Sequence, residues 1–164
     1  DSLPTSSIAM MAELDSLGFT YTLHEHPPLR TVEDSQKLRG VMPGGHIKNL
    51  YLRDRKKNNY LVVAQEDKDI DLKSLGDEID AGRLSFGSAD RLMQFLGVRP
   101  GAVSPLTLFN DGDQQVQLVM DKALYDHDLI NVHPLVNDKT LTMQMSDRDT
   151  ILATTGHLSK RIMI

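Results

Sequence analysis

The pattern of apolar and polar positions divides the chain into short helices and strands. Ser6 and Ser7 precede apolar residues at helical spacing that stop at Gly18, which predicts a helix with a serine cap and a glycine exit. Similar capping residues and glycines predict helices in the segments 31–39, 71–79, 88–96, 122–125 and 146–155. Apolar runs rich in β formers predict strands at 19–24, 47–53, 60–64, 83–86, 106–110, 115–121, 129–135, 140–145 and 158–164.

Two pairs of these strands are close enough in sequence to form hairpins. Segment 47–53 alternates, and segment 60–64 is apolar throughout, as in a strand buried on both faces. The basic turn between them, residues 53–59, is either an exposed tip or a contact for an RNA backbone. The turn Asp111-Gly112-Asp113 predicts a second hairpin that joins the strands on either side of it.

Helices are interleaved with strands, many of which come in hairpins. This order favours a mixed sheet or a partly closed barrel with helices outside over a doubly wound parallel sheet. The length of 164 residues, without repeats or long linkers, indicates a single domain over residues 1–164. We therefore expect an α/β (α+β) fold, in which helices surround a mixed, largely antiparallel, barrel-like sheet.

Composition narrows the chemistry. The chain has no cysteine, which excludes disulfides, thiol nucleophiles and thiolate metal sites and is compatible with the cytoplasm, where we expect the protein to act. It has no apolar run of membrane-spanning length and no signal-peptide pattern at its start. A net charge of −5 argues against non-specific coating of nucleic acid but leaves room for a local basic patch.

The stretch 43–52 carries the first candidate chemistry, because two glycines lead into a strand that opens with Lys48 and Asn49. A phosphate loop would need lysine directly after its last glycine and at the start of a helix, so nucleotide triphosphate binding is disfavoured. Lysine can instead hold a phosphate or a developing negative charge, and asparagine can orient a carbonyl or a hydroxyl. The alternation assigns the side chains to two faces of the strand: Ile47, Asn49 and Tyr51 on one, Lys48, Leu50 and Leu52 on the other.

Segment 98–105 is the second candidate. Gly101 lies between two prolines, which fixes a shaped loop with free backbone N–H groups. Such a loop either bounds a pocket and donates to an oxyanion, or is a stiff turn between a helix and a strand. His133, before Pro134, is either a hydrogen-bonded histidine at a strand end or a group that exchanges a proton near neutral pH.

Two further features have alternative interpretations. His24 and His26 share a face of a predicted strand, as zinc ligands would, but the prolines that follow favour a surface loop with polar contacts, and no third ligand is evident. The hydroxyl of Thr31 either caps the helix that follows or faces a pocket. Because the chain has no cysteine and no GxSxG elbow, a Cys–His hydrolase and a serine hydrolase of that type are disfavoured.

Four stretches together resemble the YbaK/prolyl-tRNA synthetase-associated domain family, and within it the free-standing alanyl-tRNA(Pro) deacylases (ProXp-ala/PrdX). They are the run 43–52, Leu84-Ser85-Phe86-Gly87, the segment 97–105 and Asn131-Val132-His133-Pro134-Leu135. They follow the family's order and span essentially the whole chain. Val132 is a mild departure, since the family has an aromatic residue at that position.

The resemblance implies the family's mixed α/β fold and hydrolysis, by an activated water, of the ester that joins a wrong amino acid to the 3′ end of tRNA. Prolyl-tRNA synthetase mistakes alanine for proline, because a pocket for proline cannot strongly reject a smaller side chain, so a second hydrolytic site is needed. The implied partners are the acceptor end of mischarged tRNA and, transiently, prolyl-tRNA synthetase. The family uses no cofactor, no metal and no covalent intermediate.

The resemblance also implies roles for single residues. Lys48 would hold the terminal phosphate or the ester, backbone N–H groups near Gly101 would stabilise the oxyanion, and His133 would position the amino group or the water. The substrate-binding positions would be Asn49, Thr31, Val32, Ser85 and Pro105. The candidates for contacts with the acceptor stem are Arg53, Arg55, Lys56 and Lys57, or Lys160 and Arg161. A related deacylase for another aminoacyl-tRNA, such as Cys-tRNA(Pro), and a non-catalytic tRNA-binding module of the same fold are the alternatives.

Overall fold

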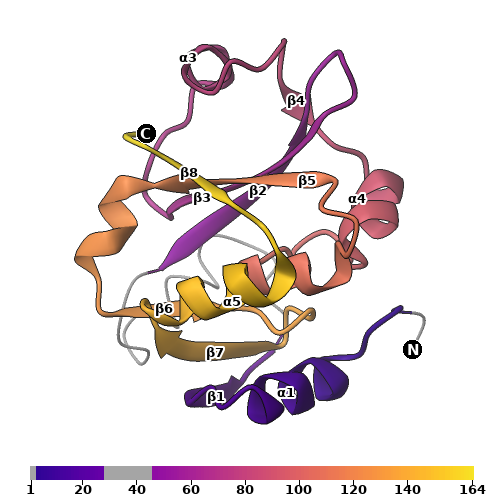
Figure 1. Cartoon of the computed structure of the whole chain (residues 1–164), viewed down its shortest axis with the longest axis vertical. Helices are drawn as coiled ribbons and strands as arrows, with labels where there is room; N and C mark the ends of the chain where they lie inside the picture. The colour runs from indigo at the N-terminus through magenta and orange to yellow at the C-terminus, as the bar shows by residue number, and fades with distance from the viewer. Residues whose placement is uncertain (1–2, 28–45) are drawn as a thin grey trace.

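Figure 1 shows the computed structural model of the protein, which describes residues 3–27 and 46–164. The described strands form two separate sheets that do not close into a barrel. The smaller sheet has three antiparallel strands in the order β1-β7-β6, with β1 at Tyr21–Glu25, β6 at Leu129–Val132 and β7 at Lys139–Gln144.

The larger sheet has five strands in the order β4-β2-β3-β5-β8. Within it, β2 pairs antiparallel with β3 and β4, whereas β5 runs parallel to both β3 and β8. The expected α/β class with a mixed, largely antiparallel sheet is therefore confirmed, and the barrel closure is not. The strand bounds are β2 Ile47–Arg53, β3 Asn59–Gln65, β4 Ser85–Phe86, β5 Val116–Asp121 and β8 Ser159–Ile162.

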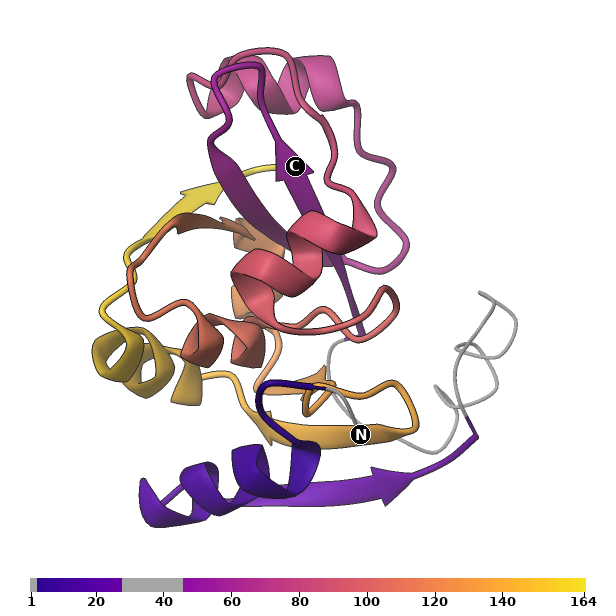
Figure 2. The same cartoon turned by 90° about the vertical axis from the view of Figure 1, so that its right-hand side faces the viewer.

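The helices lie between the two sheets, beside the larger sheet (α4) and at the ends of the molecule (Figures 1 and 2). Between the sheets lie α5 and the 3₁₀ helix η1, while α1 lies beside β1 and α3 at the opposite end of the molecule. None of the helices in the described ranges combines the length and apolarity that crossing a bilayer requires. The helix bounds are α1 Ser7–Ser16, α3 Leu72–Glu78, α4 Ala89–Leu96, η1 Pro105–Asn110, η2 Lys122–Asp126 and α5 Asp147–Thr155.

Most of the predicted helix ends are confirmed. The side chains of Ser6, Asp71 and Ser88 each accept a hydrogen bond from a backbone N–H of the first helical turn. Gly97 and Gly156 adopt the left-handed conformation that ends α4 and α5, with φ of 69° and 79°. The helix expected at 31–39 lies outside the described residues.

The predicted hairpin around Asp111-Gly112-Asp113 is wrong. Residues 105–110 form η1 instead of a strand, and the following strand β5 pairs in parallel with β3 and β8. Ser104 favours the helical turn because its Oγ accepts from the N–H of Leu106, and Pro105 has a φ suited to the first helical position. The turn itself is held by Asp111, whose carboxylate accepts the N–H groups of Gln115 and Val116.

The cap predicted for the last helix is also wrong in detail. The helix α5 begins at Asp147, but the backbone of Ser146 is already helical, with φ of −63° and ψ of −21°. Its hydroxyl donates to Oε1 of Gln144 rather than accepting from the first turn. A serine with helical φ and ψ has left the extended conformation that a side-chain cap requires.

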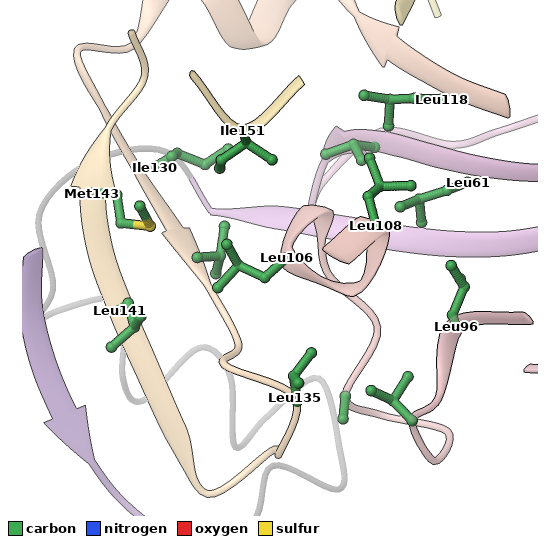
Figure 3. Packing of buried hydrophobic residues seen from close by; sticks show 14 of the residues in the cluster. Leu61, Leu96, Leu106, Leu108, Leu118, Ile130, Leu135, Leu141, Met143 and Ile151 are labelled. Atoms are coloured by element: carbon green, nitrogen blue, oxygen red, sulfur yellow. The ribbon is translucent and has the colours of Figure 1, made fainter. Parts of the chain in front are cut away.

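Buried apolar residues form two clusters, one on each face of the five-stranded sheet. Leu61 and Val63 of β3 face the cluster between the sheets, while Tyr60 and Val62 face the cluster under α3. The prediction that this strand is buried on both faces is therefore confirmed. Figure 3 shows the cluster between the sheets, where η1 and α5 bring leucine and isoleucine side chains against β6 and β7.

Candidate active site

One face of the three-stranded sheet is polar although much of it is buried. Leu141 and Met143 of β7 project from the other face into the core (Figure 3), so the alternate residues Thr140 and Thr142 lie on the face away from it. Both threonines are buried, at 4% and 6% exposure. Polar side chains surround them: His24 of β1 and His26 just after it on one side, and Asn131 of β6 and His133 just after it on the other.

His24, Thr142 and Asn131 form one row of hydrogen bonds across the three strands. The hydroxyl of Thr142 donates to Oδ1 of Asn131 over 2.6 Å. A hydroxyl has a single proton, so the contact of 3.0 Å between Thr142 Oγ1 and Nε2 of His24 is a bond in which His24 donates. Next to this row the surface is hollowed by about 200 Å³, between Thr22, Leu129 and the His24 side chain.

His26, Thr140 and His133 form a second row on the same face. Nδ1 of His26 lies 2.8 Å from the carbonyl oxygen of Pro27, and its Nε2 lies 2.8 Å from Oγ1 of Thr140. Nδ1 of His133 lies 2.9 Å from the carbonyl oxygen of Lys139 and 3.5 Å from Oγ1 of Thr140. The centres of the His26 and His133 rings are 6.4 Å apart.

The surroundings of His133 favour its neutral form. Burial lowers its pKa below the ordinary value, the carbonyl of Lys139 partly opposes this, and the nearby His26 lowers the pKa further. A carbonyl oxygen only accepts, so Nδ1 of His133 carries the proton and Nε2 carries a lone pair. This nitrogen has no hydrogen-bond partner among the described residues, so it can accept a proton or a hydrogen bond from a bound molecule.

The glycine loop and His133 are neighbours, as the catalytic prediction requires. Oγ of Ser104 donates to the carbonyl oxygen of His133 over 2.7 Å, which ties the end of the loop to the residue after β6. Gly101 has a φ of +91°, and a Cβ there would come within 3.3 Å of Nδ2 of Asn137. The loop therefore depends on glycine at this position, and it lies beside the turn that follows His133.

Pro105 points elsewhere. It is buried at the first position of η1 and lines a core cavity of about 30 Å³ with Leu108 and Val132. The predicted strand at 129–135 stops at Val132, so His133 stands in the turn between β6 and β7. Pro105 thus shapes the loop from the core side and does not line the polar face.

Lys48 and Asn49 point to opposite faces of the five-stranded sheet, as the alternation predicted. Nζ of Lys48 donates to the carbonyl oxygen of Lys68. Oδ1 of Asn49 is buried and has no hydrogen-bond partner among the described residues. Although β2 and β6 are in contact, no hydrogen bond within the described ranges joins Lys48 to His133.

The remaining predicted substrate contacts are far apart or outside the description. Ser85 is exposed in β4 opposite Arg53, which is five residues along β2 from Lys48. At about 3.3 Å per residue, that distance is roughly 16 Å. Thr31 and Val32 lie outside the described residues. The structure therefore brings together His133 and the Gly101 loop, but not Ser85.

The histidine pair of the sequence is hydrogen-bonded to neighbouring strand residues. Both His24 and His26 are bound to threonine hydroxyls, and the described ranges contain no cluster of three or more potential metal ligands. Sequence reasoning missed Thr140 and Thr142 as their partners. The available signal was the alternation of threonine with Leu141, which marks a strand with one polar face.

The fold and the site define a mixed α/β domain in which a neutral histidine stands beside a glycine loop. The sequence profile of the aminoacyl-tRNA editing domain matches residues 26–151. The chain is 41% identical over 155 residues to the prolyl-tRNA editing protein ProX of Acetoanaerobium sticklandii, covering 94% of each protein. It is 34% identical to prolyl-tRNA synthetase associated domain-containing protein 1 of Mus musculus, covering 88% of each.

Solved structures show the same fold. A crystal structure of a proposed trans-editing enzyme for prolyl tRNA synthetase superposes with a TM-score of 0.71 at 18% identity, covering 99% of each chain. The hypothetical protein APE2540 superposes equally well, with a TM-score of 0.71 at 20% identity over 95% of this chain. The chain belongs to the aminoacyl-tRNA editing domain family, which confirms the resemblance drawn from its motifs.

Proposed function

We propose that this protein is a trans-editing deacylase that hydrolyses the ester of mischarged Ala-tRNA(Pro). The observation that carries the proposal is the 41% identity to a prolyl-tRNA editing protein over 94% of both chains. The geometry around His133 supports a hydrolytic role, since it offers a neutral base beside a loop of backbone N–H groups. Alanine is the expected substrate because a synthetase pocket that fits proline cannot strongly reject a smaller residue.

The reaction needs a water, a base and a site for the oxyanion. Nε2 of His133 is the base in this proposal, because its lone pair can accept a hydrogen bond from the attacking water or from the α-ammonium group of alanine. Attack at the ester carbon forms the tetrahedral oxyanion, which backbone N–H groups near Gly101 stabilise. The proton that the attacking water loses goes to Nε2 of His133. The bond to the ribose oxygen then breaks, and Nε2 gives this proton to that oxygen, so that free alanine and the tRNA leave.

Lys48 and Asn49 supply the polar groups on β2. Lys48 would exchange the carbonyl of Lys68 for a phosphate or ester oxygen of the tRNA end, which gives its ammonium group a charged partner. Oδ1 of Asn49, which is buried and has no partner in the described part of the chain, would accept from a hydroxyl or ammonium group of the substrate. Thr31, Val32, Ser85 and Pro105 remain proposed contributors to substrate binding.

Two exposed basic groups are available for the acceptor stem. Arg55, Lys56 and Lys57 are exposed at the tip of the β2–β3 hairpin, where the carboxylate of Asp54 fixes the turn. In the second group Lys160 is exposed, but the Arg161 guanidinium lies 4.7 Å from the centre of the Tyr125 ring. The hairpin tip is therefore the better candidate for phosphate contacts, and prolyl-tRNA synthetase is a proposed transient partner.

The proposal is tested by a deacylation assay. We expect a catalytic amount of the protein to release labelled alanine from Ala-tRNA(Pro) much faster than the spontaneous reaction, and to leave Pro-tRNA(Pro) intact. Parallel reactions contain Ala-tRNA(Ala) and Cys-tRNA(Pro). Survival of every ester at its spontaneous rate, with tRNA still bound, would show a non-catalytic tRNA-binding module. Faster cleavage of Cys-tRNA(Pro) than of Ala-tRNA(Pro) would move the specificity to the related deacylase.

The same assay tests Lys48. We expect Lys48→Ala to lower kcat/KM about 100-fold, because a charged group near the developing oxyanion typically has an effect of this size. The matched control is Lys73→Ala, which removes an exposed lysine on α3 far from β6 and should leave kcat/KM unchanged. A Lys48→Ala protein with the parent's rate would remove Lys48 from the site while the activity stands.

A further inference from the structure

The two hydrogen-bonded rows on the polar face differ in where the threonine proton goes. In the first row Thr142 gives its proton to Asn131 and accepts from His24. In the second row the carbonyl oxygens of Pro27 and Lys139 fix the protons of both histidine rings, because a carbonyl can only accept. His26 and His133 are thus both protonated at Nδ1 when neutral.

This arrangement decides the direction of the Thr140 hydroxyl. Nδ1 of His133 already carries a proton, so it cannot accept from Thr140. Nε2 of His26 carries a lone pair and lies 2.8 Å from Oγ1 of Thr140, so the threonine proton points to His26. The lone pairs of Oγ1 are then left for the N–H of His133, at 3.5 Å, as a second acceptor beside the Lys139 carbonyl.

We propose that His26 is a positioning residue: by taking the Thr140 proton it leaves Oγ1 of Thr140 as a second acceptor for the Nδ1–H of His133, which adds to the Lys139 carbonyl in favouring the tautomer with a free Nε2. The catalytic consequence of this tautomer rests on the proposed function, whereas the positioning itself does not. If the His133 proton moved to Nε2, that nitrogen would become a donor and could not accept from the water or ammonium group. His26 contacts neither the water nor the ester in this proposal, because the centre of its ring lies 6.4 Å from the centre of the His133 ring.

The burial of the row supports the assignment. Thr140 is 4% exposed, so an unsatisfied hydroxyl or ring nitrogen there would carry the cost of an unpaired buried polar group. Thr140 lies in β7 and pairs with His24 of β1. His26 follows the end of β1, and His133 follows the end of β6. The row therefore joins three segments that the pairing of the sheet brings together.

The test measures the tautomer of His133 directly, by long-range proton–nitrogen NMR of the ¹⁵N-labelled protein. We expect the parent to show the Nδ1-protonated form. Thr140→Val and His26→Gln should each raise the Nε2-protonated fraction and lower kcat about fivefold to tenfold with little change in KM, the usual effect of losing one neutral hydrogen bond. Thr140→Ser keeps the hydroxyl and should restore both readouts.

The matched control is the first row. Thr142→Val and His24→Gln remove the equivalent hydrogen bonds two residues away and should leave the His133 tautomer as in the parent. An unchanged tautomer in both Thr140→Val and His26→Gln would overturn the proposal, as would an equal change in the control variants. Thermal melting checks that each variant is folded, and Thr140→Ser decides the question if Thr140→Val is not. Absence of deacylation by the parent would overturn the proposed function alone, since the NMR measurement does not depend on it.

Discussion

Side chains alternate between two faces in both sheets, but the two sheets differ in what these faces bury. In the five-stranded sheet, both faces of β3 are apolar, and the two faces bury separate clusters. In the three-stranded sheet, one face of β7 is apolar while the other buries Thr140 and Thr142 in hydrogen bonds. Apolar burial supplies most of the stability of a domain, whereas a buried polar network must be fully bonded to avoid a penalty.

The difference separates stability from chemistry. The five-stranded sheet buries an apolar cluster on each face, and in the proposed site it contributes Lys48 and Asn49 at the start of β2. The three-stranded sheet contributes Thr140, and its strand β6 leads into His133, which lies next to the Gly101 loop. Substitutions in the two sheets should therefore produce opposite combinations of effects on folding and on activity.

The largest expected effect is on the polar face. His133→Ala should lower kcat/KM for Ala-tRNA(Pro) by about 10²-fold or more, the usual range for a lost general base, while the melting temperature changes little. The control is His127→Ala, which removes a half-buried histidine whose ring bonds Gln65 away from this face and should keep the parent's activity. Equal losses in both variants would show a general effect on the fold rather than a role for His133.

The next largest expected effect is a loss of stability when the core of the larger sheet is changed. Leu61→Ala removes a fully buried side chain from β3 and should lower the free energy of unfolding by about 3 kcal/mol, measured by urea denaturation. At a temperature where the variant is folded, its kcat/KM should stay close to that of the parent. Leu23→Ala is the matched change in the smaller sheet, where the leucine is 39% exposed and should cost less than 1 kcal/mol. Equal destabilisation by the two variants would contradict the separation.

The separation also explains what could be predicted from sequence. The elements around Ser6, Asp71 and Ser88 followed from local signals, because a cap acts on the turn beside it. The opposite directions of Lys48 and Asn49 followed from alternation alone. The parallel pairing of β5 with β3 did not, because the residues around Asp111 carry a turn signal that a 3₁₀ helix and a hairpin share.

The hydrogen bonds of the polar face could not be predicted from neighbouring residues, because they join segments far apart in the sequence. His24 meets Thr142 across 118 positions of sequence, and His26 meets Thr140 across 114. The sequence around the two histidines favours a surface loop with polar contacts over a metal site, but only the pairing of β1 with β7 shows which residues they contact. The approach of the Gly101 loop to His133 depends in the same way on the Ser104 hydrogen bond.

The smallest expected effect is a loss of stability at low pH, which should come from the larger sheet. Asp54 is buried at the tip of the β2–β3 hairpin. Burial alone would raise the pKa of its carboxyl. Hydrogen bonds from Asn58, Gly82 and Tyr60 outweigh the effect of burial and lower the pKa below its ordinary value. A carboxyl with a lowered pKa stabilises the fold above its ordinary pKa, and this stability is lost as the pH falls through the folded value. Asp54→Asn should therefore cost about 1–2 kcal/mol at pH 7 in urea unfolding and progressively less below pH 4. A cost that stays constant down to pH 2 would show that the charge of Asp54 contributes nothing, and that the hairpin tip is held by shape alone.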